Sequence, residues 1–317
     1  MLRKILKSKW LKLAVTIVLI YFAFKKVDMI SVFNKLSEIN IYFLIFILLI
    51  SISASFITSY RWSLLLIKKP KFSDVLVFAK STWSASFYGL FMPTSAAGDV
   101  FKWIIIDEKY PDIPKSKLGA SILLDRFMGM SILVFFGFVS QFFATRLGVT
   151  IPSVIRLIFL VAFVGCLLFY GLVFVGKADF LFKNKWLTKI KDIGELVNIE
   201  NSKQILKSLA VSLVSDCMWV WQMWLISQYF GSNLSFLKIL IFLPVISTIL
   251  ILPISIAGFG AREQLYLYFF VNQATSPESI FLTSTFAGIV GILISLWGGL
   301  ITLTPEFKKS IKSADKK

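Results

Sequence analysis

The sequence predicts an all-α polytopic membrane protein, and three observations carry this prediction. Of the 317 residues, 57% are hydrophobic and only 16% are charged, whereas a soluble chain carries about a quarter charged residues. The mean hydropathy is +0.81. Eight apolar runs recur along the chain, each near the length that crosses a hydrocarbon core about 30 Å thick. The runs are 10–24, 41–60, 73–91, 118–143, 153–176, 205–228, 237–256 and 280–303.

The composition excludes several classes of function. The net charge of +17 does not indicate nucleic acid, because Lys and Arg lie mostly between apolar runs, where they set topology and contact anionic headgroups. There is no histidine, which removes His-based catalysis and His metal ligands. Cys166 and Cys217 lie inside apolar runs, so we expect packing residues and no disulfide framework. We expect no cofactor and no metal.

The ends of the chain indicate how the membrane domain is bounded. The basic N-terminus and the run 10–24 resemble a signal peptide, but the run ends in Lys25-Lys26 without a small-residue cleavage site. We therefore expect an uncleaved signal-anchor helix. Residues 1–303 are expected to form a single transmembrane domain of the inner cell membrane, and residues 304–317 a Lys-rich cytoplasmic tail.

The charges of the connecting segments favour six crossings over eight. With a cytoplasmic N-terminus, eight crossings place the Lys-rich segments 102–117 and 177–204 outside, which contradicts the positive-inside rule. If 73–106 and 237–271 are helical hairpins that return to the same face, six crossings remain. The cytoplasmic segments then hold 24 basic residues and the outer ones 4. Both termini are cytoplasmic in this arrangement.

The tips of the two predicted hairpins share the pattern P-x-S-x-A-G. It runs from Pro93 to Gly98 and again from Pro253 to Gly258, with Ser95 and Ser255 at its third position. Proline withholds a hydrogen-bond donor and glycine permits unusual dihedral angles, so both segments should break their helices near mid-membrane. Three crossings separate the hairpins, which predicts an inverted repeat with the substrate site between the tips. The alternative is two ordinary helix ends with turn residues.

Charged residues beside the tips are candidates for binding a lipid phosphate. Asp99 and Lys102 follow the first tip, and Arg262 and Glu263 follow the second. A helix that restarts at such a tip presents unpaired N–H groups and a positive dipole end, and Arg262 adds a bidentate donor. The alternative for Arg262 and Glu263 is a solvated pair at the outer interface.

Four further charged residues lie within or beside apolar runs. Arg61 ends the second run beside Trp62, where the favoured interpretation is an anchor at the membrane interface. Asp125 and Arg126 are expected either to neutralise each other inside the membrane or to extend to the cytoplasmic face. Asp216 stands alone among tryptophans in the run 205–228, which indicates an ion-pair partner or a role in binding protons.

Four short motifs, in order along two thirds of the chain, resemble the flippase-like family of lysylphosphatidylglycerol synthase transmembrane domains. The motifs are Tyr60-Arg61-Trp62, Met92-Pro93 through Gly98-Asp99, Leu124-Asp125-Arg126, and Ala257-Gly258-Phe259-Gly260 with Arg262-Glu263. The resemblance implies a membrane domain that moves a lipid between leaflets. The family's acidic–Arg pair matches Asp125-Arg126, but a second acid that usually follows is missing, since Gly129 lies near that place. The synthase members' aminoacyl-transfer domain is also missing, so we expect no lipid synthesis.

Taken together, the sequence predicts a lipid translocase that acts on a phosphate-bearing headgroup, with anionic membrane lipids as partners. The sequence contains no P-loop, so any energy would come from an ion gradient or from the lipid gradient. One alternative is a glycosyl- or headgroup transferase that uses a polyprenyl-phosphate donor. Another is a non-catalytic scaffold for a lipid-modifying enzyme, and a homo-oligomer is compatible with each of these functions.

Overall fold

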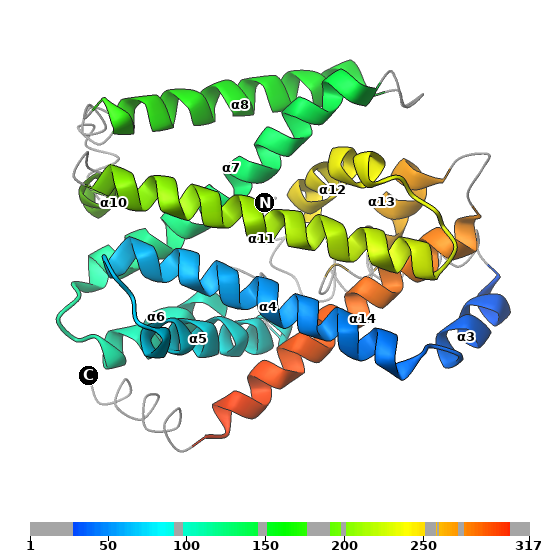
Figure 1. The fold of residues 1–317 in the computed structure, drawn as a ribbon, viewed down its shortest axis with the longest axis horizontal. Coiled ribbons are helices and arrows are strands. Elements are labelled where there is room, and N and C mark those ends of the chain that lie inside the picture. The colour runs from blue at the N-terminus through cyan, green and yellow to red at the C-terminus, as the bar shows by residue number, and fades with distance from the viewer. Residues whose placement is uncertain are drawn as a thin grey trace, which may run out of the picture.

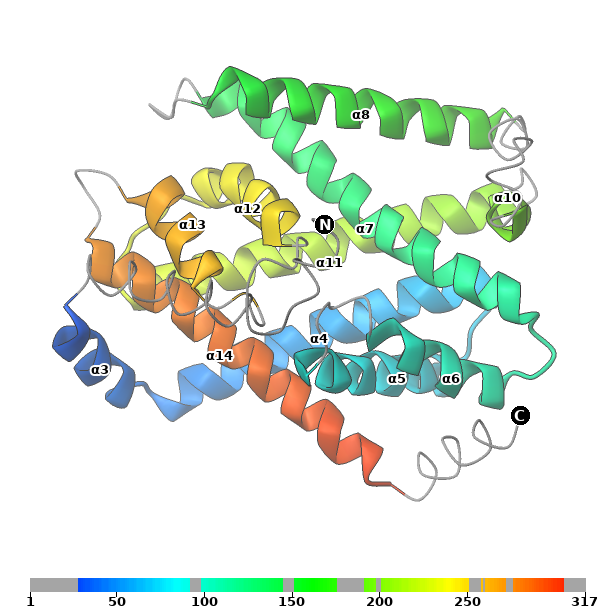
Figure 2. The same cartoon turned by 180° about the vertical axis from the view of Figure 1, so that it is seen from behind.

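The computed structural model describes residues 28–91, 98–144, 151–175, 191–197, 201–250, 258, 260–271 and 276–304. These ranges contain helices and no strands, arranged as a bundle with long helices that cross one another (Figures 1 and 2). The helices are α3 (Met29–Ser37), α4 (Ile41–Leu66), α5 (Phe72–Phe91), α6 (Asp99–Lys109), α7 (Lys115–Ala144), α8 (Ser153–Phe174), α10 (Lys191–Leu196), α11 (Ser202–Tyr229), α12 (Phe236–Leu250), α13 (Ala261–Phe270) and α14 (Pro277–Thr302).

Five of the described helices are long and apolar enough to cross a membrane: α4, α7, α8, α11 and α14. They coincide with five of the six crossings expected from the sequence. The sixth expected crossing, 10–24, lies outside the described residues, as does most of the tail 304–317. This helix content confirms an all-α polytopic fold.

Helices α5 and α6 form an antiparallel pair. At their open end, the Tyr110 hydroxyl donates a hydrogen bond of 2.7 Å to Asp74 Oδ1, and this bond lowers the pKa of the Asp74 carboxyl. Nearer the tip, Gly98 packs so closely on α5 that a Cβ there would overlap the Ala85 carbonyl oxygen. The two helices can approach this closely only because residue 98 has no side chain. The tip itself, 92–97 with Ser95, lies outside the described residues.

Helices α12 and α13 pair in the same antiparallel way. Near their open end the Phe242 ring stacks on the Phe269 ring, with centroids 5.0 Å apart. At the closed end, Leu250 of α12 lies against Gly258. Residues 251–257, which include Ser255, lie outside the described residues.

The helices fall into two sets with matching order, α4–α7 and α11–α14. Each set contains one long helix, an antiparallel pair and a second long helix. The spacing between corresponding helices is nearly constant, because those of the first set begin at positions 41, 72, 99 and 115 and those of the second at 202, 236, 261 and 277. The antiparallel pair of each set packs on the last helix of the other set, α5 on α14 and α12 on α7.

The first helices of the two sets, α4 and α11, lie side by side in antiparallel orientation through the centre of the bundle (Figure 1). Arg61 of α4 donates to Ser212 of α11, and Ser51 of α4 donates to Gln222 of α11. Counted from the first residue of each helix, Ser51 and Ser212 occupy the same position, and so do Arg61 and Gln222. The two hydrogen bonds therefore join equivalent positions of the two helices, as an approximate twofold relation between the two sets requires.

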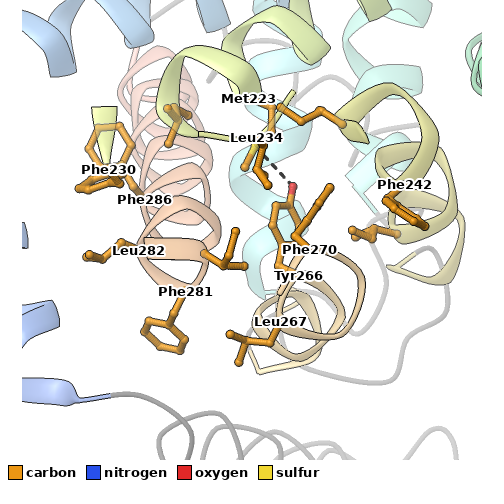
Figure 3. Close-up of a cluster of buried hydrophobic side chains, with 14 of the residues drawn as sticks. Met223, Phe230, Leu234, Phe242, Tyr266, Leu267, Phe270, Phe281, Leu282 and Phe286 are labelled. Atoms are coloured by element: carbon orange, nitrogen blue, oxygen red, sulfur yellow. Dashed lines mark hydrogen bonds between the residues drawn. The ribbon is translucent and has the colours of Figure 1, made fainter. Parts of the chain in front are cut away.

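Buried apolar side chains form two cores, one toward each end of the α4–α11 pair. One core is formed by helices α11, α12, α13 and α14 together with the first half of α4, and it includes Phe270, Phe281 and Phe286. Figure 3 shows these rings around Tyr266, whose hydroxyl contacts Met223 Sδ at 3.4 Å. The other core joins the second half of α4 to α5, α6, α7 and the start of α11, around Trp62 and Phe78. Helix α4 takes part in both cores and so connects the two sets.

Candidate functional site

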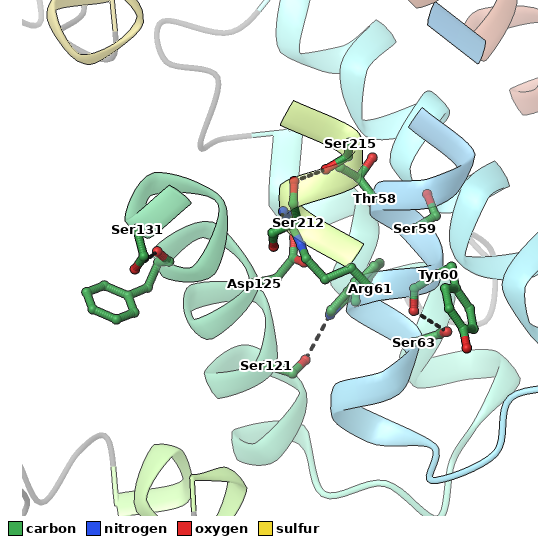
Figure 4. Close-up of polar contacts among 12 residues, drawn as sticks. Thr58, Ser59, Tyr60, Arg61, Ser63, Ser121, Asp125, Ser131, Ser212 and Ser215 are labelled. Carbon is green, nitrogen blue, oxygen red and sulfur yellow. Dashed lines mark hydrogen bonds and ion pairs between the residues drawn. The ribbon is translucent and has the colours of Figure 1, made fainter. Parts of the chain in front are cut away.

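The centre of the site is an ion pair between Arg61 of α4 and Asp125 of α7. Arg61 Nε lies 2.7 Å from Asp125 Oδ1, and Arg61 Nη1 donates to Ser212 Oγ of α11 at 3.1 Å. Arg61 is only 5% exposed and Asp125 only 7%. The guanidinium therefore joins three membrane helices, and Figure 4 shows it directed between Asp125 and Ser212. Charges at this depth are costly unless they are paired.

Gly129 leaves the space that the Arg61 guanidinium occupies. It lies one helical turn after Asp125 on α7, and a Cβ at this position would be 3.1 Å from Arg61 Nη1. The family resemblance of the sequence motifs implies that an acid is missing near Gly129. The structure shows that a larger side chain there would press against the Arg61 head.

A second carboxylate is nevertheless present, and it comes from α11. Asp216 lies one turn after Ser212 on the same helix face, and it interacts electrostatically with both Arg61 and Asp125. It is 9% exposed, and none of the described residues forms a hydrogen bond with its Oδ2. The centre thus contains one guanidinium and two carboxylates.

A second charged group, formed by Asp99, Lys102 and Arg126, lies beside this centre. Asp99, in the first turn of α6, accepts a short hydrogen bond from Arg126 Nε and lies 3.6 Å from Lys102 Nζ. The Lys102 ammonium also lies 5.3 Å from the ring centroid of Trp62, the residue after Arg61. Trp62 in turn donates from Nε1 to Ser121 Oγ at 3.0 Å (Figure 4). The two charged groups are therefore linked through neighbouring residues on α4 and α7.

Arg262 and Glu263 lie at the start of α13, in the other helix set. Gly258 and Gly260 have φ angles of +80° and +75°, which break the chain direction before the helix begins. Glu263 is 3% exposed, and its Oε2 accepts from the Gly260 N–H at 2.7 Å. The Arg262 guanidinium lies against two glycines, because a Cβ would approach it to 3.2 Å at Gly258 and would overlap it at Gly288 of α14.

Two sequence interpretations are wrong. Arg61 is not an interface anchor, because it is buried within α4 and paired with Asp125. Asp125 and Arg126 do not neutralise each other, since neighbouring residues on a helix point about 100° apart and each finds its own partner. Asp125 does not extend to the surface either, although the Arg126 side chain remains 37% exposed.

The structure brings six of the predicted site residues into the two linked groups: Arg61, Asp99, Lys102, Asp125, Arg126 and Asp216. Arg262, Glu263 and Gly258 form a further group at α13, and Gly98 packs on α5. Sequence reasoning missed Ser212 and Gly288, and it noted Gly129 only as the place of a missing acid. The helical spacing from Ser212 to Asp216 and from Asp125 to Gly129 was the available signal.

The described residues contain no group of three or more His, Cys, Asp or Glu side chains that could hold a metal ion. Both cysteines are free thiols, with Cys217 exposed on α11. The described site consists of charged side chains, which can form ion pairs and charge-assisted hydrogen bonds.

Long apolar helices around a buried charged centre define a multi-pass membrane protein with a polar site in its interior. Residues 9–298 match the family described as the lysylphosphatidylglycerol synthase TM region, and the chain belongs to this family. No curated protein and no solved structure matches the chain.

The ion pair predicts an asymmetric response to apolar substitution. Arg61→Met leaves two buried carboxylates without their cation and should lower the free energy of unfolding by about 3–5 kcal/mol. Asp125→Leu should cost less, because Asp216 remains to pair with Arg61. The double variant should recover most of the Arg61→Met loss. Unfolding in dodecyl sulfate–detergent mixed micelles measures all three, and additive losses in the double variant would contradict the buried pair.

Proposed function

We propose that this protein moves a phospholipid, or another lipid with a phosphate-bearing headgroup, between the leaflets of the inner cell membrane. The observation that carries the proposal is the group of charged side chains inside a bundle of apolar helices. Arg61, Asp125 and Asp216 are each at least nine-tenths buried. Ionisable residues at such depth are costly and are retained for substrate or ion pathways in transporters. Membership of the lysylphosphatidylglycerol synthase TM region family supports the same conclusion.

We infer a topology of six crossings and two re-entrant hairpins, arranged as an inverted repeat within a single domain, 1–303, followed by a cytoplasmic tail. Three observations support this topology. The two sets have the same helix order, α4 and α11 lie antiparallel, and the hairpin of each set packs on the last helix of the other set. The basic residues support it too. Arg61 and Lys102 have largely buried side chains that pair with Asp125 and Asp99, and removing these two from the 24 cytoplasmic charges leaves 22 against 4 outside.

The topology predicts which positions react with a membrane-impermeant thiol reagent in a chain with Cys166→Ser and Cys217→Ser. Lys69→Cys and Asp112→Cys flank the α5–α6 hairpin and should both react from the cytoplasmic face. Ser235→Cys and Glu278→Cys flank the α12–α13 hairpin and should both react from the outer face. Reaction of Lys69→Cys and Asp112→Cys from opposite faces would show that the first hairpin crosses the membrane.

The lipid phosphate is proposed to bind where Lys102 and Arg126 flank Asp99. This group carries two positive charges and one negative charge, and the partly exposed Arg126 is within reach of a headgroup. A phosphate would replace the Asp99 carboxylate as the partner of these cations, since both are anions with oxygen acceptors. Arg262, at the positive end of α13, is proposed to serve the second hairpin in the same way. Ser95, Ser255, Gly98, Gly258 and Glu263 belong to these two binding regions.

A leaflet-exchange assay tests this function. Purified protein is reconstituted into liposomes that carry fluorescent phosphatidylglycerol or, separately, a fluorescent polyprenyl phosphate, and the outer-leaflet label is quenched chemically. Wild-type protein should speed exchange of at least one probe. Arg126→Ala and Arg262→Ala should each slow it about tenfold or more, because a charge-assisted hydrogen bond contributes about 1.5–3 kcal/mol. Arg156→Ala is the matched control, since Arg156 is exposed on α8.

The results separate the function from the site. Exchange no faster than in protein-free liposomes, for both probes, would contradict lipid translocation and favour a transferase or a scaffold. Wild-type rates in both Arg126→Ala and Arg262→Ala would leave translocation standing and show that the headgroup binds elsewhere.

A further inference from the structure

Asp216 has a buried carboxylate oxygen that has no hydrogen-bond partner among the described residues. It lies near the middle of α11, between Ser202 and Tyr229, in a helix long enough to cross the membrane. Its Oδ2 accepts no hydrogen bond from a described residue, and Asp216 is 9% exposed. A buried polar atom without a partner costs free energy, and a buried charge costs more. Something other than the described side chains must therefore satisfy this oxygen.

The charges around Asp216 show that the centre lacks one positive charge. The Arg61 Nε donates to Asp125 and its Nη1 to Ser212, so the guanidinium is already engaged. With one guanidinium and two carboxylates ionised, the centre carries a net charge of −1. One positive charge would neutralise it.

The neighbouring group of Asp99, Lys102 and Arg126 carries a net charge of +1, but both cations pair with Asp99 and neither is among the groups that act on Asp216. Apart from Arg61, no described side chain acts on Asp216 with a positive charge. From α4, α7 and α8 the groups that face the centre are Arg61, Asp125 and Tyr170, and Cys217 is next to Asp216 on α11. Helices α12 and α14 also pack on α11, but their only charged residues are Lys238 and Glu278, both in first turns. Neither is among the groups that act on Asp216.

We propose that Asp216 is a proton-binding site, with the proton added to the carboxylate as an O–H and released again as the protein cycles. A proton fits better than a metal cation, because sodium or calcium needs several oxygen ligands and would be repelled by the adjacent guanidinium. The described residues contain no group of three or more His, Cys, Asp or Glu side chains that could hold such an ion. Protonation changes only the charge of the carboxyl and requires no co-reactant.

The position of Asp216 gives the proton a mechanical effect. When ionised, Asp216 competes with Asp125 for Arg61 and draws α4 toward α11. When protonated, it leaves Arg61 to Asp125 of α7. Binding of a proton to Asp216 thus weakens the attraction between α4 and α11, the helices through which the two sets contact each other. Coupling of this step to lipid movement rests on the proposed function, whereas proton binding itself does not.

Infrared difference spectroscopy of the purified protein measures protonation without any assay of transport. Spectra are recorded across a pH titration, and the C=O stretching band of a protonated carboxylic acid is followed. Wild-type protein should show a band that titrates and that Asp216→Asn removes. Asp112→Asn, an exposed aspartate in the connection after α6, is the matched control and should leave it unchanged.

A second variant guards against misfolding of Asp216→Asn. Asp125→Asn removes the competing carboxylate, so Arg61 should pair with Asp216 and hold it ionised to lower pH. The midpoint of the band should then shift to lower pH by about one unit or more, the size expected when a nearby charge is removed. A purely structural Asp216 predicts no band and no shift.

The outcomes are distinct for the two proposals. Persistence of the band in Asp216→Asn, or its absence from the wild type, would overturn the proton site. A carboxylate signal that responds to sodium against choline chloride at constant pH would also overturn it, in favour of a metal cation. A titrating Asp216 in protein that exchanges no lipid would keep the proton site and overturn translocation. Lipid exchange whose rate does not change with a pH gradient, together with the absence of the band, would keep translocation and overturn the proton site.

Discussion

The central constraint in this structure is that the charges of Arg61 and Asp125, once buried, must be paired with each other. The ion pair lies where α4, α7 and α11 meet, between two apolar cores to which both α4 and α11 contribute. In a bilayer, apolar side chains supply little preference for one helix partner over another, because lipid tails are equally apolar. A buried guanidinium with partners on two other helices is therefore specific in a way that apolar contact is not. Gly129 contributes by leaving room for it.

The two hydrogen bonds between α4 and α11 join equivalent positions but use different residues, so the two helix sets differ in charge. In one direction the contact is charged, from Arg61 to Ser212, and in the other it is neutral, from Ser51 to Gln222. The charge is thus concentrated on the side of α6 and α7, where the group of Asp99, Lys102 and Arg126 also lies. Glycines let the remaining helices approach closely, since a Cβ at Gly298 of α14 would overlap the Trp83 carbonyl oxygen of α5.

Much of the fold could be predicted because long apolar runs and loop charges are read along the chain. Five expected crossings coincide with α4, α7, α8, α11 and α14. Residue partners could not be predicted in the same way, because pairing depends on which faces of distant helices meet. Arg61 beside Trp62 has the pattern of an interface anchor, and only the continuation of α4 to Leu66 places it inside the bundle. Asp216 is solitary along the chain for the same reason, since the charged groups that act on it, Arg61 and Asp125, belong to two other helices.

A buried ion pair can be retained for stability or for function, and the variant Arg61→Met with Asp125→Leu distinguishes these. Replacing such a pair with apolar residues is often neutral or stabilising, so the double variant should fold normally. The decisive measurement is its rate of leaflet exchange in proteoliposomes at matched protein content. A rate reduced to that of protein-free liposomes, in a folded protein, is expected if the charged centre carries the transport function. Exchange at the wild-type rate would show that the pair only holds the helices together.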